Sequence, residues 1–302
     1  MDNNRYLGDI LSIDRKGTMV KDDAYSITID ENNNFNLTVY IADPITNNRS
    51  SLYYIKMWTR QEEEEKVAKF SPKGALRNYS LCEEEEKNAF CFSFKINQKG
   101  DVIGFNIEKK KVQIDLELEH DDVFDIVDEE SELCDYICLS NQLAELLYSK
   151  RTNGKEFKGY TDDNSEYNLP FPREFNLLLN SYLTKQIYDV VPLIYNVKEV
   201  AEYKGNYEMW YYTSTPTKTI ITGDYYASFT SPLRKEEDFI NLKILNDIFI
   251  EDLIESKKEN LIEIYREYLD GYIRMKEESL TTGYKRRAVW KQKILTIIYQ
   301  RN

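Results

Sequence analysis

Alternating hydrophobic and polar residues dominate the first third of the chain and are typical of half-buried β-strands. A cluster of turn residues, Glu31–Asn34, separates two of the alternating runs and predicts a hairpin. The predicted strands are Leu7–Asp14, Ala24–Asp30, Phe35–Asp43, Phe90–Ile96, Val102–Ile107 and Lys111–Leu118. Because consecutive strands are joined by short turns, the pattern predicts a mainly antiparallel sheet.

Beyond the strands, apolar residues recur at helical spacing. Helices are predicted at Cys138–Ser149, at Arg173–Asp189 behind two prolines, and from Glu237 to the C-terminus. A short apolar strand, Val191–Val197, is predicted between them, and Met209–Tyr212 carries aromatic residues that look exposed. The pattern as a whole therefore predicts an α+β fold, with a mixed, mainly antiparallel sheet and packed helices.

A single domain over residues 1–302 is the predicted organisation, because no internal repeat occurs and nothing requires an independent boundary. The best candidate linker is Lys150–Ser165, which is polar and contains glycine. Hydrophobic residues make up 41% of the chain and aromatic residues 13%, as in folded globular proteins.

The net charge of −13 argues against broad electrostatic binding of RNA or DNA. It leaves room for a narrow channel with local Lys and Arg. No apolar run is long enough to span a bilayer, and the N-terminal residues lack the apolar segment of a signal peptide. Four cysteines without such a signal read as reduced thiols. We therefore expect no membrane association and a cytoplasmic protein, with a nuclear location as the alternative.

The stretch Tyr226–Asp238 combines a proline turn with polar groups suited to phosphate. Pro232 forces a turn, and Arg234 follows at the entrance to a predicted helix, beside the hydroxyls of Thr230 and Ser231. Helix N-termini favour anions, and a guanidinium fork matches a phosphate. The alternative is an ordinary arginine on a turn between a loop and a helix.

Acidic residues at the first strand and the loop behind it suggest a cation site. Carboxylates of Asp14, Asp22 and Asp23 offer the oxygen ligands that Mg²⁺ prefers. A metal held there polarises a phosphoryl oxygen and activates water, and a nearby arginine stabilises the charge that develops. Acidic residues are also common in ordinary turns, which is the alternative interpretation.

Several segments, in order along the chain, resemble motifs of the RNase II and RNase R type exoribonucleases, the RNB family. Ile13-Asp14 followed by Asp22-Asp23-Ala24 is similar to the family's first acidic motif, and Tyr226–Arg234 resembles its Tyr-Thr-His-Phe-Thr-Ser-Pro-Ile-Arg segment. The other matching segments are Val39–Asp43, Ser80-Leu81, Glu174–Asn180 and Pro192–Glu199. The resemblance covers nearly the whole chain and implies an RNB-like catalytic domain without the flanking RNA-binding barrels.

The resemblance implies a hydrolytic 3′-to-5′ exoribonuclease that acts on single-stranded RNA with Mg²⁺. By position, Asp14, Asp22 and Asp23 would bind the metal, with Asp22 and Arg234 catalytic. Arg234 would contact the scissile phosphate and Glu174 the terminal nucleotide. Thr230, Ser231, Arg234 and Glu174 would form the RNA contacts.

The sequence also departs from the family pattern. Val20 occupies the position of the second of four acidic residues, and Tyr40 and Ser228 stand where histidine is usual. Other departures are Asn196, Lys198, Glu236, Leu242 and Lys243. These changes support an alternative: a catalytically degenerate RNB-like protein that serves as a binding or structural subunit of a larger assembly. A third interpretation is an unrelated acidic α+β binding protein.

Overall fold

The computed structural model describes residues 8–14, 16–18, 20–46, 78–120, 122–123, 133–157, 170–202, 206–250 and 254–282. The chain divides into two compact units. The first unit comprises residues 1–180 and 229–239, and the second comprises residues 181–228 and 240–302. Each unit is described by itself below.

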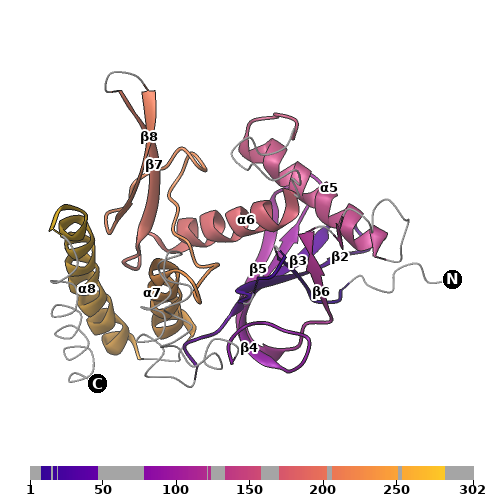
Figure 1. Ribbon diagram of the computed structural model, residues 1–302, viewed down its shortest axis with the longest axis horizontal. Helices are drawn as coiled ribbons and strands as arrows, with labels where there is room; N and C mark the ends of the chain where they lie inside the picture. The colour runs from indigo at the N-terminus through magenta and orange to yellow at the C-terminus, as the bar shows by residue number, and fades with distance from the viewer. Residues whose placement is uncertain are drawn as a thin grey trace. The chain divides into compact units, whose positions relative to one another are not determined.

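A six-stranded mixed sheet forms the centre of the first unit (Figure 1), and its strand order is β5-β4-β3-β2-β1-β6. All neighbouring strands are antiparallel except β1 and β6, which are parallel. The strands are β1 (Leu11–Asp14), β2 (Asp23–Ile29), β3 (Phe35–Ala42), β4 (Lys87–Ile96), β5 (Val102–Val112) and β6 (Leu116–Glu119). The predicted α+β class and the mainly antiparallel sheet are thus confirmed.

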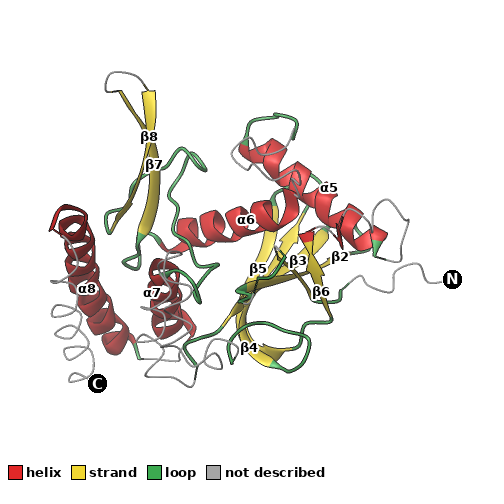
Figure 2. Ribbon diagram, in the orientation of Figure 1, coloured by secondary structure: helices red, strands yellow, loops and turns green. Residues whose placement is uncertain are grey.

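Besides the first turn of α7 (Glu236–Leu245), the described residues of the first unit include two longer helical segments. They are α5 (Cys134–Arg151) and the first part of α6 (Pro170–Ile187), shown in red in Figure 2. The Tyr136 hydroxyl of α5 donates a 2.8 Å hydrogen bond to the carbonyl of Tyr25 in β2. From α6, Phe175 makes an edge contact with the Tyr25 ring, with centroids 5.7 Å apart. Both helices therefore pack on β2. This strand begins at Asp23, the second of the two adjacent aspartates.

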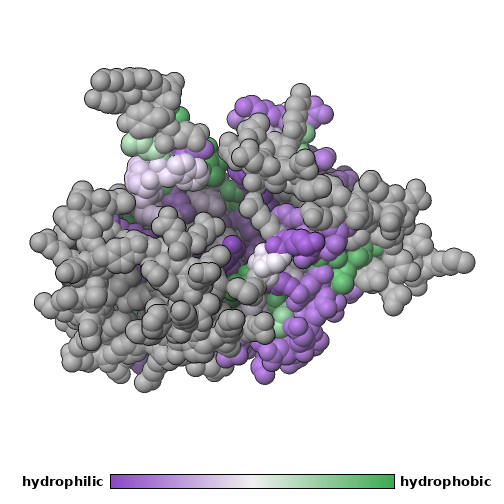
Figure 3. Space-filling view, in the orientation of Figure 1, coloured by the Kyte–Doolittle hydropathy of each residue, from purple (hydrophilic) through white to green (hydrophobic). Residues whose placement is uncertain are grey.

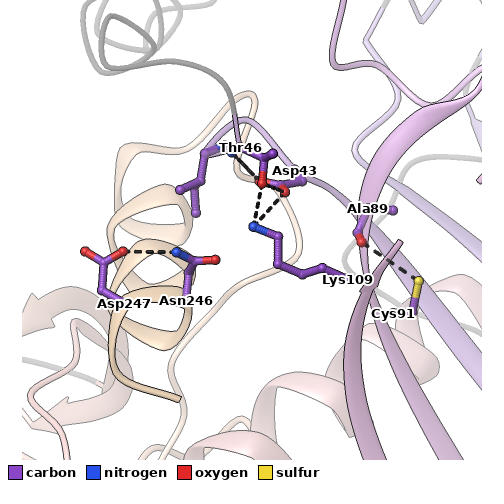
Figure 4. Close-up of polar contacts among 8 residues, drawn as sticks. Asp43, Thr46, Ala89, Cys91, Lys109, Asn246 and Asp247 are labelled. Atoms are coloured by element: carbon purple, nitrogen blue, oxygen red, sulfur yellow. Dashed lines mark hydrogen bonds and ion pairs between the residues drawn. The ribbon is translucent and has the colours of Figure 1, made fainter. Parts of the chain in front are cut away.

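The return strand β3 ends in a buried polar cluster at Asp43. Its carboxylate accepts hydrogen bonds from the Ile45 and Thr46 amides at 2.8 and 3.0 Å, and Lys109 of β5 lies 3.0 Å from it (Figure 4). Lys109 also lies over the Phe90 ring, 4.7 Å from its centroid. Asp43, the last residue of the Val-Tyr-Ile-Ala-Asp segment, therefore stabilises the turn that follows β3.

The second unit contains a two-stranded antiparallel sheet, β7 (Tyr195–Glu202) and β8 (Asn206–Thr213). Its helical part consists of the end of α6, most of α7 (Glu236–Leu245), the π-helix η2 (Asn246–Ile250) and α8 (Glu255–Thr282). Asn241 of α7 is fully buried and holds the start of β7. It accepts from the Ile194 amide at 2.8 Å and donates to the Ile194 and Ser228 carbonyls at 2.9 and 3.1 Å.

The predicted element boundaries differ from the observed ones in a few places. The predicted strand Lys111–Leu118 is divided between the end of β5 and β6, and the predicted strand Val191–Val197 begins only at Tyr195. Pro170 and Pro172 lie inside the first turn of α6, where proline is tolerated because the amide has no helical partner. The predicted continuous C-terminal helix is interrupted at Ile254, which is not helical, and residues 251–253 and 283–302 lie outside the described residues.

Residues 150–165 do not separate the two units, because they lie within the first. The part at 158–165 lies outside the described residues. No helix in the described part of the chain is long and apolar enough to cross a membrane.

Candidate active site

The acidic residues singled out in the sequence lie at adjacent strand ends. Asp14 ends β1, Asp22 directly precedes β2, and Asp23 begins it. The pairing of Leu11 with Tyr25 sets β1 antiparallel to β2, so the end of one strand and the start of the other meet at the same edge. Asp14 consequently lies within electrostatic range of Asp22, Asp23 and Arg234.

Arg234 meets this acidic edge through Asp22. Its Nε donates a hydrogen bond to Oδ2 of Asp22, and the Leu233 amide donates to Oδ1 at 2.7 Å. The Asp22 side chain is fully buried, whereas 47% of the Arg234 side chain is exposed. Among the described residues, none accepts a hydrogen bond from Nη1 or Nη2 of Arg234. The outer edge of the guanidinium is therefore available to a phosphate.

The turn before Arg234 is fixed by its own hydrogen bonds. The Ser231 carbonyl accepts from the amides of Arg234 and Lys235 at 3.1 and 2.8 Å. The Ser231 amide donates to Oδ2 of Asp238 at 2.9 Å, in the first turn of α7. Arg234 thus stands at the entrance to a helix, as the sequence predicts.

Thr230 and Ser231 are both buried in this turn. Oγ1 of Thr230 accepts a 3.4 Å hydrogen bond from Asn180. Both residues lie in the turn that leads to Arg234, as the sequence predicts. Contact of these two side chains with RNA stays a prediction.

Asp23 is held by side chains from its own strand and from α6. Its Oδ2 accepts hydrogen bonds from the Tyr25 hydroxyl and from Nδ2 of Asn176, the latter at 2.8 Å. Burial raises the pKa of Tyr25 well above its ordinary value, and the Asp23 charge adds to the rise. Tyr25 therefore remains a proton donor to Asp23 at neutral pH.

The carboxyl groups of Asp14 and Asp22 have strongly raised pKa values. Burial raises the pKa of Asp14 to about 7, and the neighbouring charge of Asp23 adds to the rise, against the opposing effect of Lys21. Burial also raises the pKa of Asp22 to about 7, opposed chiefly by the Arg234 guanidinium. Carboxylates crowded in this way are stabilised by a cation, which replaces the lost hydration.

A magnesium ion held by Asp14 and Asp23 stays a prediction, for which oxygen donors are present. Asp14 makes no hydrogen bond or ion pair within the described part of the chain, and Oδ1 of Asn176, beside Asp23, is buried without a partner. No group of three or more His, Cys, Asp or Glu suited to a metal occurs among the described residues. Mg²⁺ commonly uses only one or two carboxylates, with waters and substrate phosphates completing its shell. Both oxygens of Asp22 already accept bonds, so its role as a metal ligand stays a prediction.

Within the described part of the chain, Glu174 makes its hydrogen bonds to Arg151 and not to the residues of this acidic edge. Its carboxylate is buried and receives a forked pair of hydrogen bonds from Arg151 of α5, at 2.7 Å from Nη2 and 3.2 Å from Nε. Arg151 also lies over the Tyr148 ring. In this arrangement Glu174 joins α6 to α5, and its predicted contact with a terminal nucleotide is not tested by the geometry.

Val20 takes the place of the second acidic residue and lies in an apolar cluster. It is 4% exposed, and the buried cluster around it includes Ala24, Tyr40, Leu81 and Leu233. Where the family pattern has a carboxylate, this chain therefore has a buried apolar side chain that packs in the core.

Sequence reasoning missed three residues of the site. Tyr25 and Asn176 bind Asp23, and Lys21, which pairs with Glu117 of β6, faces Asp14. Lys21 and Tyr25 flank the acidic pair and could have been flagged by proximity. Asn176 lies 153 residues from Asp23, and only the fold brings the two together.

No protein-family model matches the sequence, and no curated protein matches it either. Solved structures do match. An active-site mutant of the Dss1 exoribonuclease from Candida glabrata has a TM-score of 0.66 and 16% identity, covering 82% of this chain and 43% of that one. RNase R from Mycoplasma genitalium, in complex with ribose-methylated single-stranded RNA, has a TM-score of 0.69 and 12% identity, covering 98% and 59%.

A further structural match is to yeast Ssd1, a pseudonuclease, with a TM-score of 0.64 and 12% identity, covering 89% of this chain and 42% of that one. At these identities the likeness shows the fold. The chain therefore has the fold of the RNB proteins, as the sequence resemblance implies, and it spans roughly half the length of the structures it matches.

Proposed function

We propose that the protein is a magnesium-dependent 3′-to-5′ exoribonuclease that acts on single-stranded RNA. The observation that carries the proposal is the convergence of Asp14, Asp22 and Asp23 with the half-exposed Arg234. The match to RNase R in complex with ribose-methylated single-stranded RNA supports RNA as the substrate. The cytoplasmic location expected from the cysteines suits such a substrate.

In this proposal, each residue of the site has a distinct task. Asp14 and Asp23 hold the magnesium ion, which when bound lowers the pKa of a coordinated water and polarises a phosphoryl oxygen. Arg234 donates from Nη1 and Nη2 to non-bridging oxygens of the scissile phosphate. Asp22 fixes the guanidinium through Nε, and Tyr25 and Asn176 fix the Asp23 carboxylate.

The test is release of nucleotides from the 3′ end of 5′-labelled single-stranded RNA in the presence of Mg²⁺. We expect Asp22→Asn to lower kcat/KM by about 100-fold or more, because Arg234 loses its charged anchor. Asp14→Asn should raise the Mg²⁺ concentration needed for half-maximal activity. Asp101→Asn is the matched control, since Asp101 is an exposed aspartate on the β4–β5 turn of the same unit.

RNA whose 3′ end is removed by circularisation should not be degraded. If wild-type protein releases no 3′ nucleotides, or if Asp22→Asn releases them at the wild-type rate, the proposal is wrong.

Two observations favour a second candidate, a degenerate RNB-like protein that binds RNA without cutting it, as a subunit of a larger assembly. Val20 has replaced an acidic residue with core packing, and both oxygens of Asp22 are already bonded. The likeness to Ssd1, a pseudonuclease, is in accord with this candidate. Binding of RNA with no cleavage at any Mg²⁺ concentration would favour it.

A further inference from the structure

The β7–β8 hairpin in the second unit exposes large side chains on one face and buries part of the other face. Cross-strand pairing places Lys198 opposite Trp210, and because side chains alternate, Val200 and Tyr212 lie on the same face as this pair. On the other face, Tyr195 is 1% exposed and Val197 is fully buried, whereas Tyr211 is 38% exposed. We call the first surface, together with Lys276 of α8, the aromatic–lysine face.

This face leaves large apolar side chains in solvent. Trp210 is 61% exposed and Val200 is 50% exposed. In the space-filling view (Figure 3), the described part of the hairpin shows pale lavender, green and purple atoms, a mixture of apolar and polar residues. The exposed tryptophan and valine offer an apolar surface to a ligand.

Two lysines lie against the rings of this face. Nζ of Lys198 lies 4.7 Å from the centroid of Trp210, and Nζ of Lys276 lies 4.9 Å from that of Tyr212. Lys276 also lies 5.2 Å from the ring of Tyr272, its neighbour on α8. The face therefore combines exposed ring surface with positive charge, in a chain whose net charge is −13.

We infer that the aromatic–lysine face binds single-stranded RNA, with bases stacked on Trp210 and phosphates paired with Lys198 and Lys276. Aromatic side chains with interleaved cations are the means by which proteins hold single strands without reading their sequence. A base can stack on an indole in spite of the acidic net charge, and the two lysines supply the local complement to the phosphates. The choice of RNA rests on the proposed function, whereas the face itself is independent of hydrolysis at Asp22.

The test is fluorescence anisotropy of a labelled single-stranded oligoadenylate titrated with the full chain in EDTA, where no metal-dependent cleavage occurs. We expect Trp210→Ala to weaken binding by about 10-fold and Trp210→Phe to retain most of it. Lys198→Ala and Lys276→Ala should each reduce the slope of log K against log salt by about 0.7. Phe249→Ala, which removes a 44% exposed aromatic residue of the same unit, is the matched control.

Circular oligoadenylate separates this surface from the site at Asp22. The aromatic–lysine face needs no 3′ end, so the circular RNA should compete with the linear probe, and Trp210→Ala should weaken binding of the circular RNA as well. If RNA hydrolysis is absent but Trp210→Ala still weakens binding, only the proposed function fails. Equal binding by wild type and Trp210→Ala would overturn this inference. So would loss of self-association in Trp210→Ala without any change in RNA binding, because the face would then join copies of the chain.

Discussion

At the scale of the residue, the main feature is that the buried carboxylate of Asp22 fixes the position of the half-exposed Arg234 side chain. Asp22 is buried and receives bonds from the Leu233 amide and from Arg234. A buried charge requires such partners, because its lost hydration is otherwise uncompensated. The sequence indicates both residues, but their pairing across 212 positions is a result of the fold.

Val20 allows a direct test of whether the missing acid can be restored. Val20→Asp should destabilise the protein by about 3–5 kcal/mol, since the new carboxylate would lie unpaired in an apolar cluster. Val20→Ala, which removes only methyl groups, should cost about 1–2 kcal/mol. Urea denaturation measures both changes. A Val20→Asp variant that is as stable as wild type and degrades RNA faster would show that this position opens to the proposed metal site.

At the scale of the element, the β2–β3 hairpin depends on one aspartate at its turn. Asp30 accepts hydrogen bonds from the Asn32 and Asn34 amides, both at 2.9 Å, and Lys95 of β4 lies 2.7 Å away. Asn33 in this turn has a φ of 58°, a left-handed conformation that asparagine tolerates. The pattern Asp-Glu-Asn-Asn-Asn thus predicts the turn correctly because the side chains themselves make its bonds.

The stability difference between wild type and a variant of this turn, Asp30→Asn, should depend on pH. The hydrogen bond from Lys95, followed by those from Asn34, holds the pKa of Asp30 well below its ordinary value. A lowered folded-state pKa stabilises the protein above the unfolded value of about 4, and the effect is lost as the pH falls further. Asp30→Asn should therefore lower the melting temperature at pH 7, with a smaller difference near pH 3. A difference that grows on acidification would contradict the sign of this shift.

Asn241 links α7 to the start of β7 within the second unit. Asn241→Ala would leave the Ile194 amide and two buried carbonyl groups without partners, so we expect a loss of about 3 kcal/mol. Lys243→Ala, two residues later, breaks only the pair with Asp247 and should cost about 0.5 kcal/mol or less. Denaturant titration of both variants checks the difference. Equal losses would mean that the Asn241 bonds are not structural.

At the scale of the whole molecule, the open question is whether the two compact units unfold together. Helices α6 and α7 each contribute residues to both units. Unfolding either unit would therefore disrupt a helix of the other, and we expect the single domain predicted over residues 1–302 to unfold in one transition.

Hydrogen exchange by mass spectrometry during urea titration checks this expectation. Peptides from β3 and β4 report on the first unit and peptides from β7 and α8 on the second. We expect the same midpoint for both sets. Two separate midpoints would show two independently stable domains.

The sequence by itself determined the strands with clear alternation, the turn at Asp30, the helix that follows Arg234 and the acidic and basic halves of the candidate site. These features are local, because hydrogen bonding and side-chain periodicity within a few residues decide them. Only the tertiary structure decided that Asp22 pairs with Arg234, that Asn176 binds Asp23, that Val20 lies in the core and that Trp210 stays in solvent. Each of these depends on segments far apart in the chain, whose approach is set by packing of the whole core and leaves no periodic signal in the sequence.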